Sequence, residues 1–350
     1  MLIVGQAQTL PVKSDLDDDL RDLLDPPIHV GPFSANGEYL AGWDWRSVWV
    51  WRVKDGKQMA TMKAQDVLCL AVSNDGRWIA AGTSKDKTPL VWDANTYKQV
   101  FVLTGAYKQG IEYLERKISG VDFSPDSARL VSTSDNNAAV VWDIATRRHV
   151  QILRHDGLQP LAAKYSPHGD QVATATYDSV CVWDSNSGRL LVVIPVEIFP
   201  YYNSGLLWFH NHLYCLCYDR IKKFEASTGS ALSEWPIQTI DYSSYIALPK
   251  HGEFIACSTN STVTFWDTST HTQLGLIQLP RDRPFIALSP DGRHLAIGGK
   301  TSEITIQSLS HIIVSVVFVW ITTYLNMFLA PLFIIGFNSI FSSTVHLPGI

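Results

Sequence analysis

The sequence predicts an all-β fold, a seven-bladed β-propeller, and three observations support this prediction. An alternating apolar run that ends in a large apolar marker residue recurs seven times, at nearly constant intervals. A tight turn rich in Pro, Asp, Asn and Gly precedes most of these runs. A further apolar stretch follows most markers, so each unit holds four short strands. Four short strands repeated at this period are typical of the blades of a β-propeller.

The markers fix the phase of the repeat, because each one closes the third strand of its unit. They occur in the strings VWVWRVKDGK, PLVWDANTYK, VVWDIATRRH, VCVWDSNSGR, IKKFEASTGS, VTFWDTSTHT and ITIQSLS. The markers are Trp51, Trp92, Trp142, Trp183, Phe224, Trp266 and Ile306. Their spacing is almost uniform, and the single longer step, from Trp92 to Trp142, indicates an insertion. A single unit cannot bury both faces of its sheet, so we expect neighbouring units to pack into a ring.

The turn between the first and second strands of each unit has its own signature. It occurs as FSANGEYLAG, VSNDGRWIAAG, FSPDSARLVST, YSPHGDQVATA, LPKHGEFIACS and LSPDGRHLAIGG, and in a degenerate form, WFHNHLYCLCY, in the fifth unit. Pro, Asp, Asn and Gly supply the φ values that a tight turn requires. The small residues after the turn allow sheets to approach closely.

Four of the units carry a Trp-Asp pair, and with these pairs the chain resembles the WD-repeat family of β-propellers. The resemblance covers roughly residues 28–309, and its structural markers are Trp51, Trp92, Asp93, Trp142, Asp143, Trp183, Asp184, Trp266 and Asp267. The Gly-His pair that usually precedes the innermost strand in this family is absent, and Arg154-His155 is the nearest match. Asp135 and Asp178 lie where the family places a turn Asp that binds this His. We therefore expect the polar network to be incomplete in most blades.

Residues 1–27 are predicted to form an acidic extension in front of the propeller, which spans residues 28–309. Within it, SDLDDDLRDLLDPP predicts a short amphipathic helix from Ser14, a helix cap, to the Pro26-Pro27 pair that ends it. This helix either rests its leucines on the propeller or binds a partner. The earlier stretch LIVGQAQTL is a candidate strand for completing the seventh unit from the other end of the chain.

Three unusual segments are predicted to share one face. The insertion TGAYKQGIEYLERKIS joins the outer strand of one unit to the inner strand of the next, and the acidic extension occupies the equivalent connection. In the family that the chain resembles, these connections share a face with the turn before the third strand, where Asp44, Trp45 and Arg46 occur. Long loops are often tolerated without function, but aromatic and Arg side chains are common interface anchors. The predicted partner-binding face comprises Asp44, Trp45, Arg46, Tyr107, Lys108, Tyr113, Arg116, Tyr202, Tyr242 and Arg283.

No motif for catalysis, phosphate binding or zinc binding occurs in the sequence. The innermost strands are predicted to start at His29, Asp66, Lys117, Gln159, Tyr202, Tyr242 and Arg283, a mixture without an acid–base pair or a ligand set. The net charge of −5 gives no reason to expect nucleic-acid binding. Five cysteines in apolar runs predict buried free thiols in a reducing compartment. We predict no catalytic residue, metal, cofactor or small-molecule substrate.

Residues 310–350 differ from the rest of the chain, because no Asp, Glu, Lys or Arg occurs from residue 304 to residue 350. In the first interpretation, residues 312–337 form a transmembrane helix, and the Lys and Arg residues before it place the propeller in the cytoplasm. In the second, Ile313–Val317 is the outer strand of the last unit. In the third, the segment is not a natural continuation of the chain, for instance translated non-coding sequence.

These observations favour a non-catalytic scaffold of the WD-repeat type that binds other proteins. We expect it to be a single-pass membrane protein with a cytoplasmic propeller, and a soluble cytoplasmic protein is the alternative. Two further hypotheses stay open: a propeller enzyme with an active site in the central channel, and the recognition half of a larger signalling protein. Propellers serve many unrelated processes, so the fold does not identify the partner.

Overall fold

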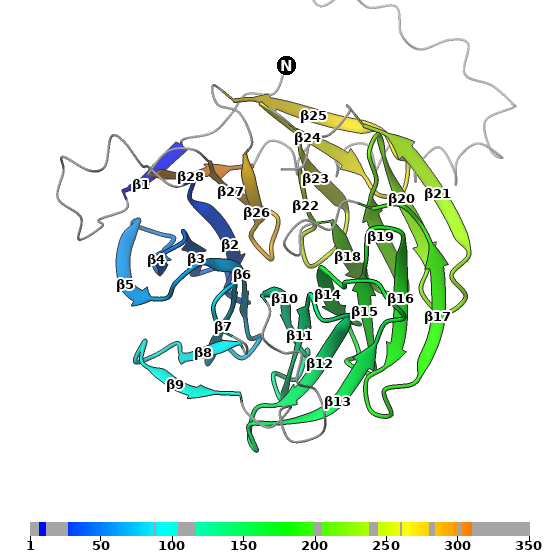
Figure 1. The fold of residues 1–350 in the computed structure, drawn as a ribbon. Helices are drawn as coiled ribbons and strands as arrows, with labels where there is room; N and C mark the ends of the chain where they lie inside the picture. The colour runs from blue at the N-terminus through cyan, green and yellow to red at the C-terminus, as the bar shows by residue number, and fades with distance from the viewer. Residues whose placement is uncertain are drawn as a thin grey trace, which may run out of the picture.

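The computed structural model describes residues 7–11, 27–86, 89–103, 117–198, 205–237, 244–259, 261–279, 284–299 and 303–309. Their strands form seven four-stranded antiparallel sheets around a central axis (Figure 1). This confirms the seven-bladed all-β propeller. None of the described segments forms an apolar helix of membrane-spanning length. Most of the predicted acidic helix, residues 104–116 of the insertion, and the apolar segment with both its predicted span and its predicted strand lie outside the described residues.

Each of the first six blades takes its four strands from one continuous stretch of chain. Blades 1 and 2 comprise β2 (His29–Phe33), β3 (Tyr39–Trp43), β4 (Ser47–Arg52), β5 (Lys57–Lys63), β6 (Val67–Val72), β7 (Trp78–Thr83), β8 (Leu90–Asp93) and β9 (Gln99–Val102). Blades 3 and 4 comprise β10 (Ile118–Phe123), β11 (Arg129–Ser134), β12 (Ala138–Asp143), β13 (Arg148–Arg154), β14 (Ala162–Tyr165), β15 (Gln171–Ala175), β16 (Ser179–Asp184) and β17 (Leu190–Pro195). Blades 5 and 6 comprise β18 (Leu206–Phe209), β19 (His212–Leu216), β20 (Arg220–Glu225), β21 (Ala231–Pro236), β22 (Tyr245–Ala247), β23 (Phe254–Thr259), β24 (Thr262–Asp267) and β25 (Gln273–Gln278).

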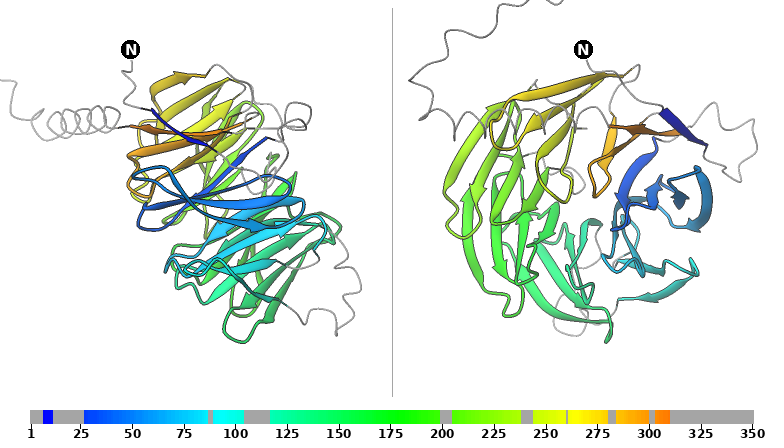
Figure 2. Two further views of the ribbon diagram at one scale, coloured as in Figure 1. Left: turned by 90° about the vertical axis from the view of Figure 1, so that its left-hand side faces the viewer. Right: turned by 180° about the vertical axis from the view of Figure 1, so that it is seen from behind.

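Blade 7 closes the ring with strands from two distant parts of the chain. It consists of β26 (Phe285–Leu288), β27 (His294–Gly298), β28 (Glu303–Ser308) and, outermost, β1 (Ala7–Pro11). Thr9 of β1 pairs with Thr305 of β28 in an antiparallel register. The innermost strands of neighbouring blades contact one another all round the ring, and β26 contacts β2. Figure 2 shows the resulting ring from the side and from behind.

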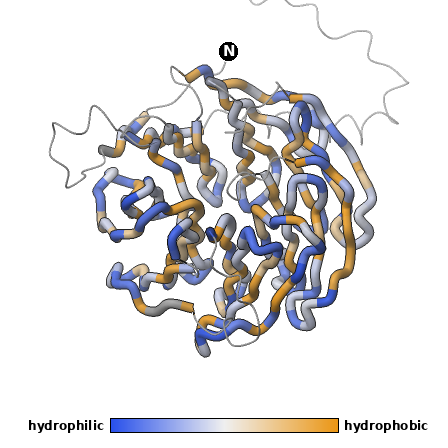
Figure 3. Tube along the Cα trace, in the orientation of Figure 1, coloured by the Kyte–Doolittle hydropathy of each residue, from blue (hydrophilic) through white to orange (hydrophobic). Residues whose placement is uncertain are grey.

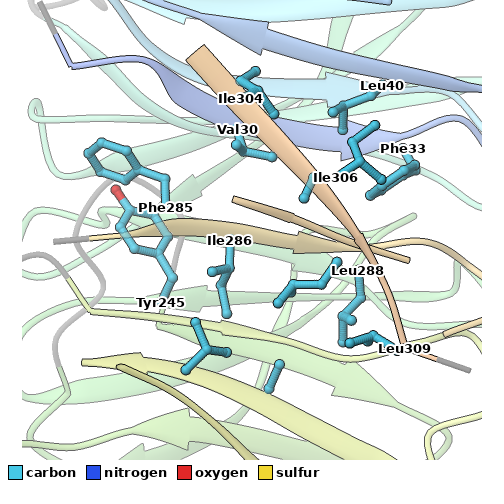
Figure 4. Packing of buried hydrophobic residues seen from close by; sticks show 14 of the residues in the cluster. Val30, Phe33, Leu40, Tyr245, Phe285, Ile286, Leu288, Ile304, Ile306 and Leu309 are labelled. Carbon is cyan, nitrogen blue, oxygen red and sulfur yellow. The ribbon is translucent and has the colours of Figure 1, made fainter. Parts of the chain in front are cut away.

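The seam between blade 7 and blade 1 is filled by one large apolar cluster. Ile304 and Ile306 of β28 lie beside Val30, Phe33 and Leu40 of blade 1 (Figure 4). Leu10 of β1 belongs to the same cluster and is fully buried. Apolar residues recur along the strands of every blade (Figure 3). Burial of apolar surface is the dominant favourable contribution to folding, so this seam stabilises the closed ring.

The turn signature of the first two strands has a repeated hydrogen-bond pattern. In blade 3, Ser124 Oγ donates to Asp126 Oδ1 at 2.6 Å and accepts from the Arg129 backbone N–H at 2.8 Å. Ser73 makes the same pair of contacts in blade 2, with Asp75 and with the Trp78 backbone N–H. Side-chain oxygens of this kind replace the backbone partners that a tight turn lacks. The Ser-x-Asp spacing in the sequence thus encodes the geometry of the turn.

The marker residues lie in the core between blades. Trp51, Trp92, Trp142, Trp183, Phe224 and Ile306 are buried, and Trp266 is half-buried. The Asp that follows a marker Trp caps the next turn: Asp143 Oδ1 accepts from the backbone N–H and the hydroxyl of Thr146, both at 2.7 Å. Such bonds favour the ionised carboxylate and lower the pKa of Asp93, Asp143 and Asp184. The Trp-Asp pair therefore couples a core anchor to a turn cap.

All five cysteines are free and buried. Burial raises the pKa of Cys69 and of Cys257 to about 12. Cys215 and Cys217 lie in one apolar cluster between blades 4 and 5. They therefore pack as small apolar side chains, as the apolar runs around them predict.

Candidate protein-interaction face

One face of the ring is formed by two kinds of connection. In blades 1, 3, 4 and 5, the turn between the second and third strands meets the described residues that follow the outermost strand. Backbone hydrogen bonds join them: His155 N–H donates to Asn137 O at 2.8 Å, Ile198 N–H to Tyr177 O at 3.1 Å, and Ile237 N–H to Asp219 O at 2.9 Å. We name this surface the crossover face and define it by residues 44–46, 64–66, 135–137, 155–160, 176–178, 196–198 and 217–219.

Three exposed aromatic side chains occupy the same turn position on the crossover face. Trp45, Tyr177 and Tyr218 are the middle residues of the turns between the second and third strands of blades 1, 4 and 5. Their side chains are 41%, 55% and 57% exposed. Large aromatic residues are usually withdrawn from solvent, and they are enriched at protein interfaces because they offer a rigid apolar body. The hairpins formed by the second and third strands of these blades hold the three side chains toward solvent.

The turn of blade 1 combines a structural acid with an exposed pair. The carboxylate of Asp44 accepts from the backbone N–H groups of Arg46 and Ser47 at 2.7 and 2.8 Å, and this side chain is buried. Burial raises the pKa of Asp44, and the backbone bonds oppose that shift. The guanidinium of the exposed Arg46 lies 4.5 Å from the centre of the Trp45 ring. Asp44 thus shapes the turn, while Trp45 and Arg46 present a cation–π pair to solvent.

The other residues predicted for the partner-binding face fall outside the described part of the chain. They are Tyr107, Lys108, Tyr113, Arg116, Tyr202, Tyr242 and Arg283. Conversely, Tyr177 and Tyr218 were not predicted, although the repeat phase alone identifies them as counterparts of Trp45. Aligning every unit on its turn, rather than examining the first unit only, finds both residues.

Blades 3 and 4 contain well-developed polar contacts behind this face. Trp142 Nε1 donates to Ser132 Oγ at 2.8 Å, and Trp183 Nε1 donates to Thr174 Oγ1 at 2.8 Å. Thr174 Oγ1 also lies 2.9 Å from His155 Nε2, and burial lowers the pKa of His155 to about 4. Asp178 accepts from the hydroxyls of Thr176 and Ser179. A marker Trp, a hydroxyl and a His from the connecting loop are thus linked in blade 4.

Comparison with known proteins agrees with this architecture. The family model of the WD domain, G-beta repeat, matches residues 56–93 and 110–143. WD repeat-containing protein 18 of Danio rerio is 25% identical over 179 residues, which cover 47% of this chain and 39% of that protein. Periodic tryptophan protein 2 of Arabidopsis thaliana is 27% identical over 154 residues, covering 43% of this chain and 16% of that protein. The chain thus contains WD repeats and is similar to WD-repeat proteins. It spans less than half the length of these relatives.

The central channel of this WD-repeat propeller holds a pocket of about 930 Å³, which is lined mainly by the innermost strands. Its charged side chains include Asp122 and Lys164, whose Oδ1 and Nζ atoms lie 3.4 Å apart. Asp122 Oδ2 also accepts from the Tyr165 backbone N–H at 2.8 Å. Burial raises the pKa of Asp122. These contacts join β10 to β14, so the pair links two blades of the WD-repeat ring.

Proposed function

We propose that this WD-repeat protein is a non-catalytic scaffold that binds protein partners through the crossover face. The observation that carries the proposal is the repeated exposure of Trp45, Tyr177 and Tyr218 at one turn position of three blades. Aromatic anchors on rigid elements lose little conformational freedom on binding. The WD repeats and the similarity to WD-repeat proteins support a scaffold, since propellers of this family typically bind other proteins.

Proximity labelling in cells, followed by purification of the labelled proteins, tests this proposal. The variant carries Trp45→Ala, Tyr177→Ala and Tyr218→Ala together. The matched control carries Val150→Ala, Leu190→Ala and Leu232→Ala, three exposed apolar residues of the outermost strands β13, β17 and β21. We expect the face variant to lose most of its labelled partners and the control to retain them, with both proteins folded. Retention of every partner by the face variant would refute the proposal.

We further propose that residues 312–337 anchor the chain in a membrane, with the propeller on the cytoplasmic side. The support is compositional: most residues of this segment are apolar and none is charged, and the nearest Lys and Arg residues all precede it. Alkaline extraction of membranes from cells that express the full chain, or a chain stopped after Leu309, tests it. The full chain is expected in the membrane pellet and the shortened chain in the supernatant. An unfolded or aggregated shortened chain would instead assign the segment to the propeller.

A further inference from the structure

The crossover face contains a pocket between blades 3 and 4 that differs from the rest of the face. It has a volume of about 590 Å³ and is lined by Asp135, Asn136, Asn137, Gly157, Leu158, Gln159 and Tyr177. The first three residues form the turn before the third strand of blade 3, and Tyr177 lies in the equivalent turn of blade 4. The remaining three come from the loop that joins the two blades. Three connections of the chain thus enclose one pocket.

The walls of this pocket are partly apolar and open to solvent. Leu158 and Tyr177 are 39% and 55% exposed. A flat ring beside an aliphatic side chain is a surface that suits the methylene stem of a long side chain. The ring face of Tyr177 also attracts cations, because the π-system of a Tyr is electron-rich.

The polar lining of the pocket includes one carboxylate and three amides, so it offers acceptors and donors and carries a negative charge. It contains the carboxylate of Asp135 and the amide of Asn136, and among the described residues that line it there is no Lys, Arg or His. Asn136 Oδ1 is shielded from solvent and has no hydrogen-bond partner within the described part of the chain. When the half-buried Asn136 side chain turns toward the pocket, this oxygen can accept from an incoming donor without losing an existing hydrogen bond. A buried acceptor without a partner raises the free energy of the unbound state, so a ligand that donates to it is favoured.

The surroundings of the pocket add negative charge close to the lining. Asp156 and Asp178 are exposed, and each is the chain neighbour of a lining residue. Burial raises the pKa of the nearby Cys181, and the charges of Asp178 and Asp156 raise it further. Lys117 directly precedes β10 and Arg154 ends β13, and neither residue lines the pocket.

We infer that this pocket binds an arginine side chain of a partner protein. Arginine matches the lining better than lysine does, because its planar group donates several hydrogen bonds in one plane and stacks on aromatic rings. Its donors reach Asp135 and Asn136, its stem lies on Leu158, and its planar face lies against Tyr177. The inference rests on the proposed function and assigns a partner chemistry to one part of the crossover face.

Nuclear magnetic resonance titration of the isotope-labelled protein with N-acetyl-arginine amide tests the inference. The neutral isostere N-acetyl-citrulline amide and N-acetyl-lysine amide serve as comparison probes. We expect shifts confined to the amides of residues 135–137, 157–159 and 177, and binding of citrulline about tenfold weaker, since the charge-assisted bonds are lost. Equal binding of arginine and citrulline, shifts elsewhere on the ring, or no shifts at any concentration would each overturn the inference.

Two variants and one control localise the effect. Asp135→Asn removes the charge, and Tyr177→Ala removes the stacking surface at an exposed position. Each is expected to weaken arginine binding about fivefold or more. Tyr218→Ala, on the same face in blade 5, is expected to bind arginine as the wild type does. If arginine fails to bind while Trp45→Ala and Tyr218→Ala still abolish partner capture, the scaffold function stands and only the arginine pocket is refuted.

Discussion

Blades 1 and 3 use the same marker residue in two different ways. Trp51 and Trp142 are both fully buried, at 0% and 1% exposed. Trp142 Nε1 donates to Ser132, whereas Trp51 Nε1 is buried without a hydrogen-bond partner among the described residues. The position of blade 1 that corresponds to Ser132 is Gly42, where an added Cβ would lie 3.0 Å from the Trp51 ring. Blade 1 therefore gains close packing where blade 3 gains a hydrogen bond, so the marker defines a core position and not a polar network.

The largest expected effect tests whether the two markers are equally important for packing. Trp51→Ala and Trp142→Ala should each lower the free energy of unfolding by about 3 to 5 kcal/mol, because each leaves a large cavity in a packed core. Denaturant titration of the purified propeller measures both losses. A loss below about 1 kcal/mol at either position would mean that the marker does not support the core there.

The next effect concerns the His that extends the network of blade 4. Burial lowers the pKa of His155 from 6.5 to about 4. Between these values the unfolded chain binds a proton that the folded protein does not, so the free energy of unfolding falls as the pH falls. The loss from His155 should reach about 2 to 3 kcal/mol near pH 4.

Denaturant titration between pH 7 and pH 4 measures this loss. Burial lowers the pKa of His29 to about 4 as well, and it also lowers the pKa of His212 and His271, so His155 is one of several such contributions in the wild type. His155→Gln should have a smaller slope than the wild type and retain the part that the other groups supply. If the slope of His155→Gln equals that of the wild type, His155 is not buried in the neutral form.

A smaller effect separates the hydrogen bond from the packing. Trp142→Phe should cost about 1 kcal/mol more than Trp51→Phe, because only the former breaks a hydrogen bond and leaves the Ser132 hydroxyl without its donor. Thermal and chemical unfolding of both variants provide the comparison. Addition of Ser132→Ala to Trp142→Phe should recover part of the loss. Equal losses in the two single variants would show that the Trp142 bond contributes nothing.

The smallest expected effect on stability lies at the surface of blade 1. Trp45→Ala with Arg46→Ala should change the free energy of unfolding by no more than about 0.5 kcal/mol, because both side chains are exposed. The same variant should weaken partner capture in the labelling experiment. Loss of folding and of partner capture together would show that the turn, and not the interface, was damaged.

The sequence predicts those parts of the molecule that repeat. The marker residues and the Ser-x-Asp turns recur in phase, and each recurrence strengthens the prediction of the next. The outer strand of blade 7 does not repeat in this way. Two apolar segments at opposite ends of the chain, LIVGQAQTL and Ile313–Val317, both suited this position. The structure pairs β1, from the N-terminal segment, with β28. Hydropathy alone does not distinguish the N-terminal candidate from the C-terminal one.

The pocket between blades 3 and 4 was beyond prediction for a different reason. Its lining comes from turns of two successive blades, and its shape depends on how these turns and the loop between them pack on each other. Gln159 was expected at the start of an inner strand and instead lines this pocket, outside the ladder of β14. Positions in a repeat are encoded locally, whereas a hollow between repeats depends on side-chain packing.

The pairing of β1 with β28 also sets the order of events during synthesis. Of the described strands, β1 is the first to leave the ribosome and β28 is the last. Six blades can form from continuous chain before β28 provides the strand edge with which β1 pairs. A nascent chain that stalls before β28 holds an open ring with Leu10 and the seam residues uncovered. Such exposed apolar surface is prone to aggregation until β28 is translated and the ring closes.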